Sequence, residues 1–278
     1  MAAALSRRSD LSLVVCARRP MDELHVESNS GLIRVTPMVV TQPEQAPSVD
    51  WVIVTTKAYD APGALIWLRR LCADGAPAAI LQNGVEHRAR FSGEIPPERL
   101  VPVVVDCPAE RVSATLVRQR GPVSLTVENN GPGRAFIQLF EQTDFKLTPT
   151  DDWTSAAWRK LCLNAAGVIS ALLLQPAGVM RDEELGEVSR QLVREGIAVG
   201  RAEGATLDDA LVEEVLNSYR QAPPDSVNSL HADRLAGRPT ELDARNGAIV
   251  RLGQKHGIPT PANEMAVALL SALTTARR

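Results

Sequence analysis

Trp51-Val-Ile-Val-Thr-Thr56 and Ala78-Ala-Ile-Leu-Gln82, with a helix-like pattern over residues 61–73 between them, decide the fold. Both outer segments are short apolar runs, as expected for strands that are buried on both faces of a parallel sheet. The middle segment has the length and apolar spacing of a crossover helix, which favours an open α/β sheet over a β-sandwich. Leu11–Ala17 and Leu100–Val105 have the same apolar character, so we expect them to add strands to this sheet.

The character of the chain changes after about Pro149, where long helical patterns with little strand signal begin. Asp151 or Asp152 can cap the first of these helices, which runs through Val168. Pro239 and Thr260-Pro261 are start signals for the last two. We therefore expect a sheet domain over residues 1–149 and an all-helical domain over residues 150–278. The other helical patterns cover residues 183–203, 208–222, 239–256 and 261–276.

The 278 residues, 45% of them apolar, can build one large or two moderate domains. A formal charge of −3, with acids and bases mixed along the chain, gives no footprint for nucleic acid or for an anionic membrane. The four cysteines are widely spaced, which argues against a zinc site and a disulfide framework. No apolar run reaches membrane-spanning length, and residues 1–8 lack the apolar core of a secretory signal. We expect a cytoplasmic protein without a metal.

Polar residues follow several of the predicted strands, and ligands of such a sheet lie at the carboxyl ends of its strands. Lys57 and Asn83-Gly84 stand at two of these ends, although a solvated lysine and a simple turn would explain each of them alone. Arg18 follows the first apolar run. A nicotinamide cofactor with a 2′-phosphate favours arginine at that place, whereas one with a free ribose hydroxyl favours an acid. The pattern therefore favours NADPH, with an ordinary basic loop as the alternative.

Lys160 and Asn164 are four residues apart in a helical pattern, which places both side chains on one face, one turn apart. Together with the carboxylate of Glu241, this lysine and this amide have the chemistry to reduce a carbonyl group. Each residue also has a purely structural explanation. Lys160 could be a surface lysine beside Trp158, Asn164 a buried amide with local partners, Glu241 a first-turn acid of a helix and Ser229 a helix cap.

These motifs, in this order, resemble the ketopantoate reductase family, also called the 2-dehydropantoate 2-reductases. The resemblance covers almost the whole chain, and its motifs are specific in combination. It implies a Rossmann-like dinucleotide-binding domain over residues 1–149, followed by a helical substrate and catalytic domain over residues 150–278. The motifs are Val54-Thr-Thr-Lys57-Ala-Tyr, Leu81-Gln-Asn83-Gly84, Trp158-Arg-Lys160 through Asn164, Ser229 through Asp233, Gly237-Arg-Pro-Thr-Glu241-Leu-Asp243 and Asn246-Gly247.

The resemblance also implies a reaction and the residues that carry it. The reaction is the NADPH-dependent reduction of a 2-oxo acid, ketopantoate or a less polar relative, to a 2-hydroxy acid, as in pantothenate biosynthesis. Lys160 is expected to be the catalytic lysine, and Glu241 to act between cofactor and substrate. Asn83, Asn164 and Ser229 are expected to contact the substrate. The implied cofactor contacts are Arg18 at the 2′-phosphate, Lys57, Asn83 and Gly84 near the nicotinamide and ribose, Ala109 and Glu241.

Two departures from the family pattern carry expectations. The chain has no G-x-G-x-x-G motif after a first strand. We therefore expect the Rossmann-like domain to be incomplete at its amino terminus, most simply because the start site is placed too far downstream. Val168-Ile169 stands where the family often has asparagine and proline. Since an apolar residue there cannot hydrogen-bond a polar substrate, a more apolar 2-oxo acid is as good a candidate as ketopantoate.

Two other functions stay open at this level. The missing glycine motif favours a cofactor-binding or interaction protein with impaired catalysis, whereas Lys160 and Glu241 oppose this interpretation. An opine-type dehydrogenase would use a related cofactor arrangement with an amine as second substrate. The sequence predicts a small-molecule partner and neither nucleic acid nor a membrane. It leaves the oligomeric state open, with a homodimer among the alternatives.

Overall fold

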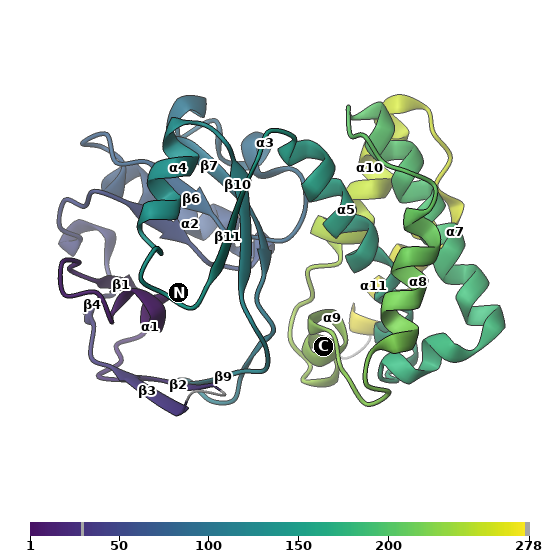
Figure 1. Ribbon diagram of the computed structural model, residues 1–278, viewed down its shortest axis with the longest axis horizontal. Helices are drawn as coiled ribbons and strands as arrows, with labels where there is room; N and C mark the ends of the chain where they lie inside the picture. Colours follow the sequence, from purple (N-terminus) through teal and green to yellow (C-terminus); the bar gives the residue numbers. More distant parts are fainter. Residues whose placement is uncertain (29–30, 276–278) are drawn as a thin grey trace. The chain divides into compact units, whose positions relative to one another are not determined.

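The computed structural model describes residues 1–28 and 31–275 and divides into two compact units (Figure 1). The first unit comprises residues 1–56, 60–82 and 87–151. The second comprises residues 57–59, 83–86 and the chain from residue 152 onward. It therefore includes two short loop segments that follow strands of the first unit in the sequence.

The first unit is built around a five-stranded sheet. Its strands are β5 (Val52–Val54), β6 (Ala78–Ile80), β7 (Leu100–Asp106), β10 (Ser124–Glu128) and β11 (Lys146–Thr150), in the order β11-β10-β7-β6-β5. Strands β5, β6 and β7 are parallel, as their apolar runs predict, with Ala78 opposite both Val52 and Leu100. Strand β10 runs antiparallel to β7 and parallel to β11.

Helices cover both faces of this sheet. They are α1 (Ala2–Leu5), α2 (Ala61–Leu71), α3 (His87–Phe91) and α4 (Gly131–Gln138). Helices α2 and α3 share a core with Ala78 and Ile80 of β6, whereas α1 and α4 share another with Ala79. Because alternate residues of a strand point to opposite faces, these two cores lie on the two sides of the sheet. The predicted α/β fold is confirmed, and α2 occupies the predicted crossover helix.

Two smaller sheets complete the first unit. Strand β1 (Val14–Cys16) pairs in parallel with β4 (Met38–Val40), and Val14 packs into the same small core as Val52 and Trp67. Among the described residues, β1 pairs with β4 alone and β5 with β6 alone, so the prediction that Leu11–Ala17 adds a strand to the main sheet is wrong. The apolar runs do not predict the second small sheet, whose order is β3-β2-β9-β8. Its strands are β2 (Leu24–Ser28), β3 (Gly31–Val35), β8 (Ala109–Arg111) and β9 (Leu116–Gln119).

The second unit is helical apart from its two loop segments and its connecting turns. Asp152 caps the first helix as predicted, because its carboxylate accepts a hydrogen bond from the Ser155 N–H at 2.9 Å. The elements are α5 (Trp153–Ala166), α6 (Val168–Leu173), the 3-10 turn η4 (Ala177–Arg181), α7 (Glu183–Ala202), α8 (Leu211–Gln221), α9 (Ser229–Leu235), the π-helical turn η5 (Asp243–Gly247), α10 (Ala248–His256) and α11 (Pro261–Thr275).

One predicted helix start in this unit is wrong, and so is the explanation of Ser229 as a helix cap. Pro239 does not begin a helix, since the first helical residue after it is Asp243. Ser229 does not cap α9; the side chain of Asn228 does so by accepting a hydrogen bond from the His231 N–H at 3.0 Å. The last residue of the helix predicted over 261–276 lies outside the described residues.

Helix α7 packs closely against α5, and two glycines permit this approach. A β-carbon added to Gly200 would lie 3.0 Å from the Trp158 ring, and one added to Gly196 would lie 3.0 Å from Cys162 Sγ. Side chains of both helices fill one core, in which Trp158 and Leu161 meet Val193 and Ile197. The position of α5 is therefore set by α7.

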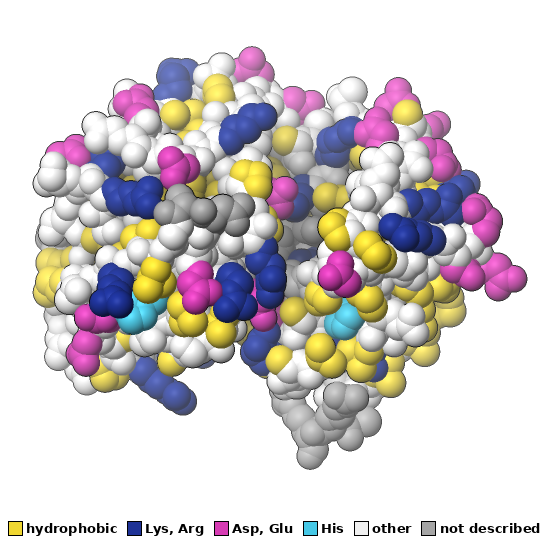
Figure 2. Space-filling view, turned by 60° about the horizontal axis from the view of Figure 1, so that its bottom comes forward, with side chains coloured by type: hydrophobic (Ala, Val, Ile, Leu, Met, Phe, Trp, Pro, Cys, Tyr) yellow, Lys and Arg dark blue, Asp and Glu magenta, His cyan; other side chains and the backbone are white. Residues whose placement is uncertain are grey.

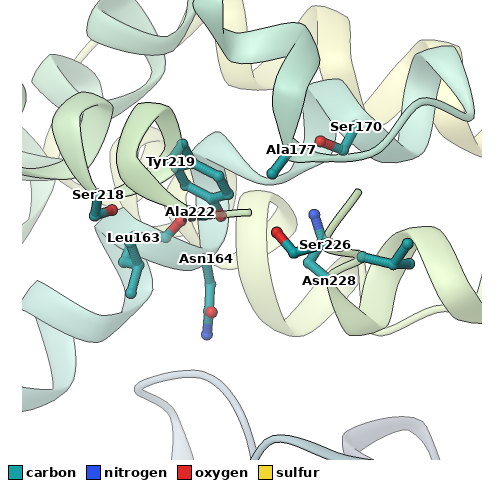
Figure 3. Close-up of a pocket in the computed structure, with 10 residues that line it drawn as sticks. Leu163, Asn164, Ser170, Ala177, Ser218, Tyr219, Ala222, Ser226 and Asn228 are labelled. Carbon is teal, nitrogen blue, oxygen red and sulfur yellow. Dashed lines mark hydrogen bonds between the residues drawn. The ribbon is translucent and has the colours of Figure 1, made fainter. Parts of the chain in front are cut away.

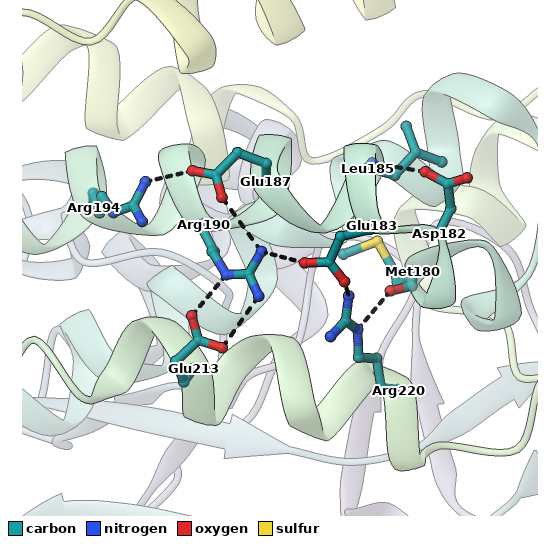
Figure 4. A network of polar contacts seen from close by, with 9 residues as sticks. All are labelled: Met180, Asp182, Glu183, Leu185, Glu187, Arg190, Arg194, Glu213 and Arg220. Carbon is teal, nitrogen blue, oxygen red and sulfur yellow. Dashed lines mark hydrogen bonds and ion pairs between the residues drawn. The ribbon is translucent and has the colours of Figure 1, made fainter.

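A network of ion pairs joins α7 to α8 on the outer side of this core (Figure 4). Arg190 of α7 donates to Glu213 of α8 at 2.7 Å and to Glu183 at 2.8 Å. Arg220 of α8 donates back to Glu183 at 2.6 Å and to the Met180 carbonyl at 3.1 Å. Arg190 and Glu183 each have more than one charged partner. Such a network contributes more to stability than isolated ion pairs on the surface do.

Charged side chains of both signs are interspersed over the face shown in Figure 2. Apolar side chains lie between them rather than in one continuous patch. No described helix is at once long enough and apolar enough to cross a membrane.

Candidate active site

Lys57, in the loop after β5, lies between two buried carboxylates of the second unit. Its Nζ is 2.8 Å from Asp233 Oδ2 and 3.3 Å from Glu241 Oε2. The lysine side chain is 36% exposed, whereas those of Asp233 and Glu241 are only 9% and 5% exposed. Lys57 is therefore a partner of two buried acids, and the explanation of it as a merely solvated lysine is wrong.

Glu241 gathers hydrogen-bond donors from two loop segments. Its Oε1 accepts from the Ala58 N–H at 2.9 Å, and its Oε2 accepts from Asn83 Nδ2 at 2.9 Å. Burial alone would raise the pKa of Glu241, but the charge of Lys57 and these two donors outweigh it and hold the pKa below its ordinary value. Glu241 is thus a buried carboxylate that stays ionised. It precedes η5 rather than lying in a first helical turn, so the helix dipole does not explain it.

The amide of Asn83 extends this arrangement to helix α5. Asn164 Nδ2 donates to Asn83 Oδ1 at 3.3 Å, so a row of hydrogen bonds runs from Asn164 through Asn83 to Glu241. Lys160 stands one helical turn before Asn164 on α5 and is half-buried. Gly84 has φ +105, and a β-carbon there would lie 2.7 Å from the Ala244 carbonyl oxygen. Only glycine fits this turn, which rests against the segment after Glu241.

Helix α9 contributes Ser229 and Asp233, one turn apart. Ser229 is exposed, and its Oγ accepts a hydrogen bond from Arg245 Nη2 at 2.7 Å. Asp233 Oδ1 accepts from Arg238 Nε at 3.0 Å, while its other oxygen holds Lys57. The sequence reasoning missed Asp233 and Arg245. Asp233 could have been found from its i+4 spacing to Ser229, whereas the burial of Arg245, with Ala244, Asn246 and Gly247, is evident only from the structure.

Two of the predicted cofactor residues lie in the first unit and outside this cluster. Arg18 Nη2 is 3.5 Å from Asp60 Oδ2, and the arginine side chain is 86% exposed. Ala109 is exposed at the start of β8. Within the second unit the structure therefore brings together Lys57, Asn83, Asn164 and Glu241 and places Lys160 one turn from Asn164, whereas Arg18 and Ala109 belong to the first unit.

A pocket of about 220 Å³ opens in the second unit (Figure 3). Asn164 lines it, together with Tyr219 and Asn228. Its volume is below the roughly 300–1,000 Å³ of sites for drug-sized ligands, which indicates a small molecule. Further lining residues are Leu163, Ser170, Ala177, Ser218, Ala222, Ser226 and Val227. Most of its accessible wall is apolar, with a few hydroxyl and amide groups in it.

Val168 does not line this pocket. It is fully buried and packs with Leu216 and Leu230 in the core under α6. Its apolar character therefore serves packing, and the expectation that it removes a hydrogen bond from the substrate site is not supported.

Tyr219 lines the pocket as a neutral group. Its hydroxyl donates to the Leu163 carbonyl at 2.9 Å. Burial raises the pKa of Tyr219 to about 12, with the charge of Arg245 acting in the opposite direction. Tyr219 is thus poorly suited to release a proton at neutral pH.

Comparisons with known proteins agree with this arrangement. The sequence profile described as "Ketopantoate reductase PanE/ApbA" matches residues 1–131, and its companion for the C-terminal part matches residues 152–274. A 2-dehydropantoate 2-reductase of Caulobacter vibrioides is 52% identical, over 98% of this chain and 94% of that protein. One from Mycobacterium tuberculosis is 37% identical, over 97% and 92%.

A solved structure shows the same architecture. The PanE/ApbA family ketopantoate reductase of Ralstonia eutropha aligns with a TM-score of 0.90 and 28% identity, over 99% of this chain and 94% of that one. A Rossmann-like domain followed by a helical domain is common to both. On these matches, and on the motifs that meet around Glu241, the chain belongs to the ketopantoate reductase family.

Proposed function

We propose that this protein reduces ketopantoate to pantoate, with NADPH as the hydride source, in pantothenate biosynthesis. The observation that carries the proposal is the row of hydrogen bonds from Asn164 through Asn83 to Glu241, with Lys57 bound to the same carboxylate. These residues come from four separate segments of the chain. Their meeting around one buried acid supports a substrate site at this place.

Lys160 is the proton donor in this proposal. Lysine ammonium groups are protonated at neutral pH, so Lys160 first polarises the carbonyl oxygen and then gives its proton to the developing alkoxide. Its place one turn from Asn164 on α5 allows both side chains to face the same ligand. Asn164 would fix the substrate through its amide while Lys160 acts on the oxygen.

Glu241 orients the groups around it. Its carboxylate is ionised, nearly fully buried and already held by Ala58, Asn83 and Lys57. A side chain held so firmly can accept a hydrogen bond from a substrate hydroxyl without moving. Glu241 therefore acts by position and charge in this proposal, and Lys160 acts by proton transfer.

A nicotinamide cofactor fits the donor groups of the chain, and its chemistry when bound is to supply a hydride. Members of the family use such a cofactor. Lys57 and Asn83 offer a cation and an amide in the two loops that follow β5 and β6, and such loops carry the ligand contacts of a parallel sheet. Arg18, exposed and basic, would bind a 2′-phosphate, which supports NADPH over NADH.

Two polar groups in the pocket lining support a polar substrate. Asn164 and Ser226 offer an amide and a hydroxyl to a small ligand, and ketopantoate carries a hydroxyl as well as its 2-oxo acid. A pocket that hydrogen-bonds a hydroxyl rejects analogues without it, because its own polar groups are then left unpaired. We therefore expect ketopantoate to be preferred over more apolar 2-oxo acids.

Steady-state NADPH oxidation tests the proposal. Ketopantoate, 2-oxo acids without the hydroxyl, and each acid with added amine are offered to the purified protein. We expect turnover with ketopantoate that amines do not increase. Faster turnover with amines would indicate an opine-type dehydrogenase. A folded protein that binds NADPH but oxidises none with any of these would be a binding protein.

A further inference from the structure

Arg245 is a buried cation that the proposed mechanism does not use. It lies in η5 and is 3% exposed. Within residues 1–28 and 31–275 its one side-chain hydrogen bond is the donation from Nη2 to Ser229 Oγ, and its buried Nε has no partner. The charges of Glu241 and Asp233 favour the guanidinium, but burial outweighs them, and leaving most of its five N–H donors without a hydrogen bond is costly. A ligand that brings negative charge to this place would offset that cost.

The neighbours of Arg245 connect it to the pocket. Ser229 follows Asn228, which lines the pocket, and Tyr219, whose pKa the charge of Arg245 lowers against the effect of burial, lines it as well. The turn that carries Arg245 is π-helical, a geometry frequent at functional sites. The guanidinium thus lies beside Ser229, which adjoins the pocket residue Asn228 in the chain.

The hydrogen bond from Arg245 fixes what Ser229 can offer. A hydroxyl has one proton to donate, and its oxygen accepts. Because Arg245 occupies the accepting side, the Ser229 proton remains for a ligand. A carboxylate that accepts this proton would also meet the charge of the buried Arg245 behind it, and hydrogen bonds that involve charged groups are stronger than neutral ones.

We propose that Arg245, acting through Ser229, anchors the carboxylate of the 2-oxo acid and so selects acids over their neutral amides. The inference rests on the proposed function and deepens it. Ser229 touches the substrate, whereas Arg245 is a positioning residue that orients the hydroxyl and supplies charge.

The test compares ketopantoate with its neutral amide in wild type and in Arg245→Met, a replacement of similar volume without charge. We expect KM for the acid to rise about 10- to 100-fold, as for a lost charge-assisted hydrogen bond, with kcat and NADPH affinity little changed. KM for the amide should stay the same, so the preference for the acid disappears. Arg245→Lys, which keeps the charge, should recover part of that preference.

Arg234→Met is the matched control. Arg234 is also buried, on α9, but its Nη1 donates to the backbone carbonyls of Ala171 and Leu172. Its loss should lower stability and leave the ratio between acid and amide unchanged. An Arg245→Met protein that still prefers the acid as strongly as wild type would overturn the inference.

Failure of the proposed function can be told apart from failure of this inference. If wild type oxidises no NADPH with any 2-oxo acid, the proposed function is wrong. The proposed role of Arg245 in binding the carboxylate is then tested by calorimetry, which compares the affinities for pantoate and for its amide. Tighter binding of pantoate that is lost in Arg245→Met supports the anchor, and equal binding of both compounds overturns it. If Arg245→Met does not fold, Arg245→Lys and Ser229→Ala are measured in the same way, and an unchanged preference in both overturns the inference.

Discussion

Lys57 and Glu241 are 184 residues apart in the chain, and yet the lysine Nζ lies 3.3 Å from the glutamate Oε2. Asp233 holds the other side of the same ammonium group at 2.8 Å. Burial opposes the charge of Lys57, but the two acids outweigh it and raise its pKa above the ordinary value. The ion pairs of Lys57 therefore hold the loop after β5 against α9 and the segment before η5.

Low pH should weaken the ion pair between Lys57 and Glu241. The pKa of Glu241 in the folded chain lies below its ordinary value of 4.5, so its stabilising effect is complete above that pH and is lost as the pH falls through the folded-state pKa. Glu241→Gln should remove this part of the acid sensitivity, as measured by urea midpoints from neutral pH to below pH 4.5. Asp225→Asn, at an exposed acid of the same unit, should leave the profile unchanged. Identical profiles for Glu241→Gln and wild type would contradict the prediction.

Removing the proton donor should affect turnover far more than binding. Lys160→Ala is expected to lower kcat about 10²- to 10⁴-fold, the range typical of a positioned general acid. NADPH affinity, measured by fluorescence titration, should be nearly unchanged. Lys146→Ala, at an exposed lysine of β11, serves as the control. Normal turnover in Lys160→Ala would remove this residue from the mechanism.

Arg18 should set the choice of cofactor. Arg18→Ala is expected to reduce the ratio of kcat/KM with NADPH to that with NADH by about tenfold or more, since a hydrogen bond to a charged phosphate is lost. The value with NADH alone should change little. Arg34→Ala, at another exposed arginine of the first unit, should leave the ratio intact. An unaltered ratio in Arg18→Ala would mean that the 2′-phosphate is bound elsewhere or is not required.

Val168→Asn should cost stability without improving catalysis. Val168 is fully buried beside Leu216 and Leu230, so an amide there would be desolvated without a built-in partner. We expect a loss of about 1–3 kcal/mol in the free energy of unfolding, measured with urea. KM for ketopantoate should not decrease. A tighter KM would show that this position reaches the substrate after all.

The apolar runs predicted the parts of the fold that are buried on both faces. Strands β5, β6 and β7 and helix α2 fall where continuous apolar stretches place them. The sheet of β2, β3, β8 and β9 escaped prediction because its residues are mostly half-buried or exposed, and all three residues of β8 are exposed. Such strands are defined by their neighbours rather than by their own apolar pattern.

The site was predictable as a set of motifs but not as a set of contacts. Lys57, Asn83, Asn164 and Glu241 were each named from the sequence, whereas the partnership of Lys57 with Asp233 joins segments 176 residues apart and has no local signal. The wrong helix start at Pro239 shows the same limit. Proline allows a first helical turn there, yet Glu241 bonds to Ala58 and Asn83 from an irregular segment that a helix would have displaced.

The two glycines of α7 bear on how this enzyme could be re-engineered. Alanine at residue 196 or 200 would press a methyl group against Cys162 or Trp158 and push away the helix that carries Lys160 and Asn164. A displacement of roughly 1 Å in a catalytic group can cost on the order of 10²-fold in rate. Directed evolution toward other substrates should therefore randomise the pocket wall and hold both glycines constant, although neither lies near the reacting atoms.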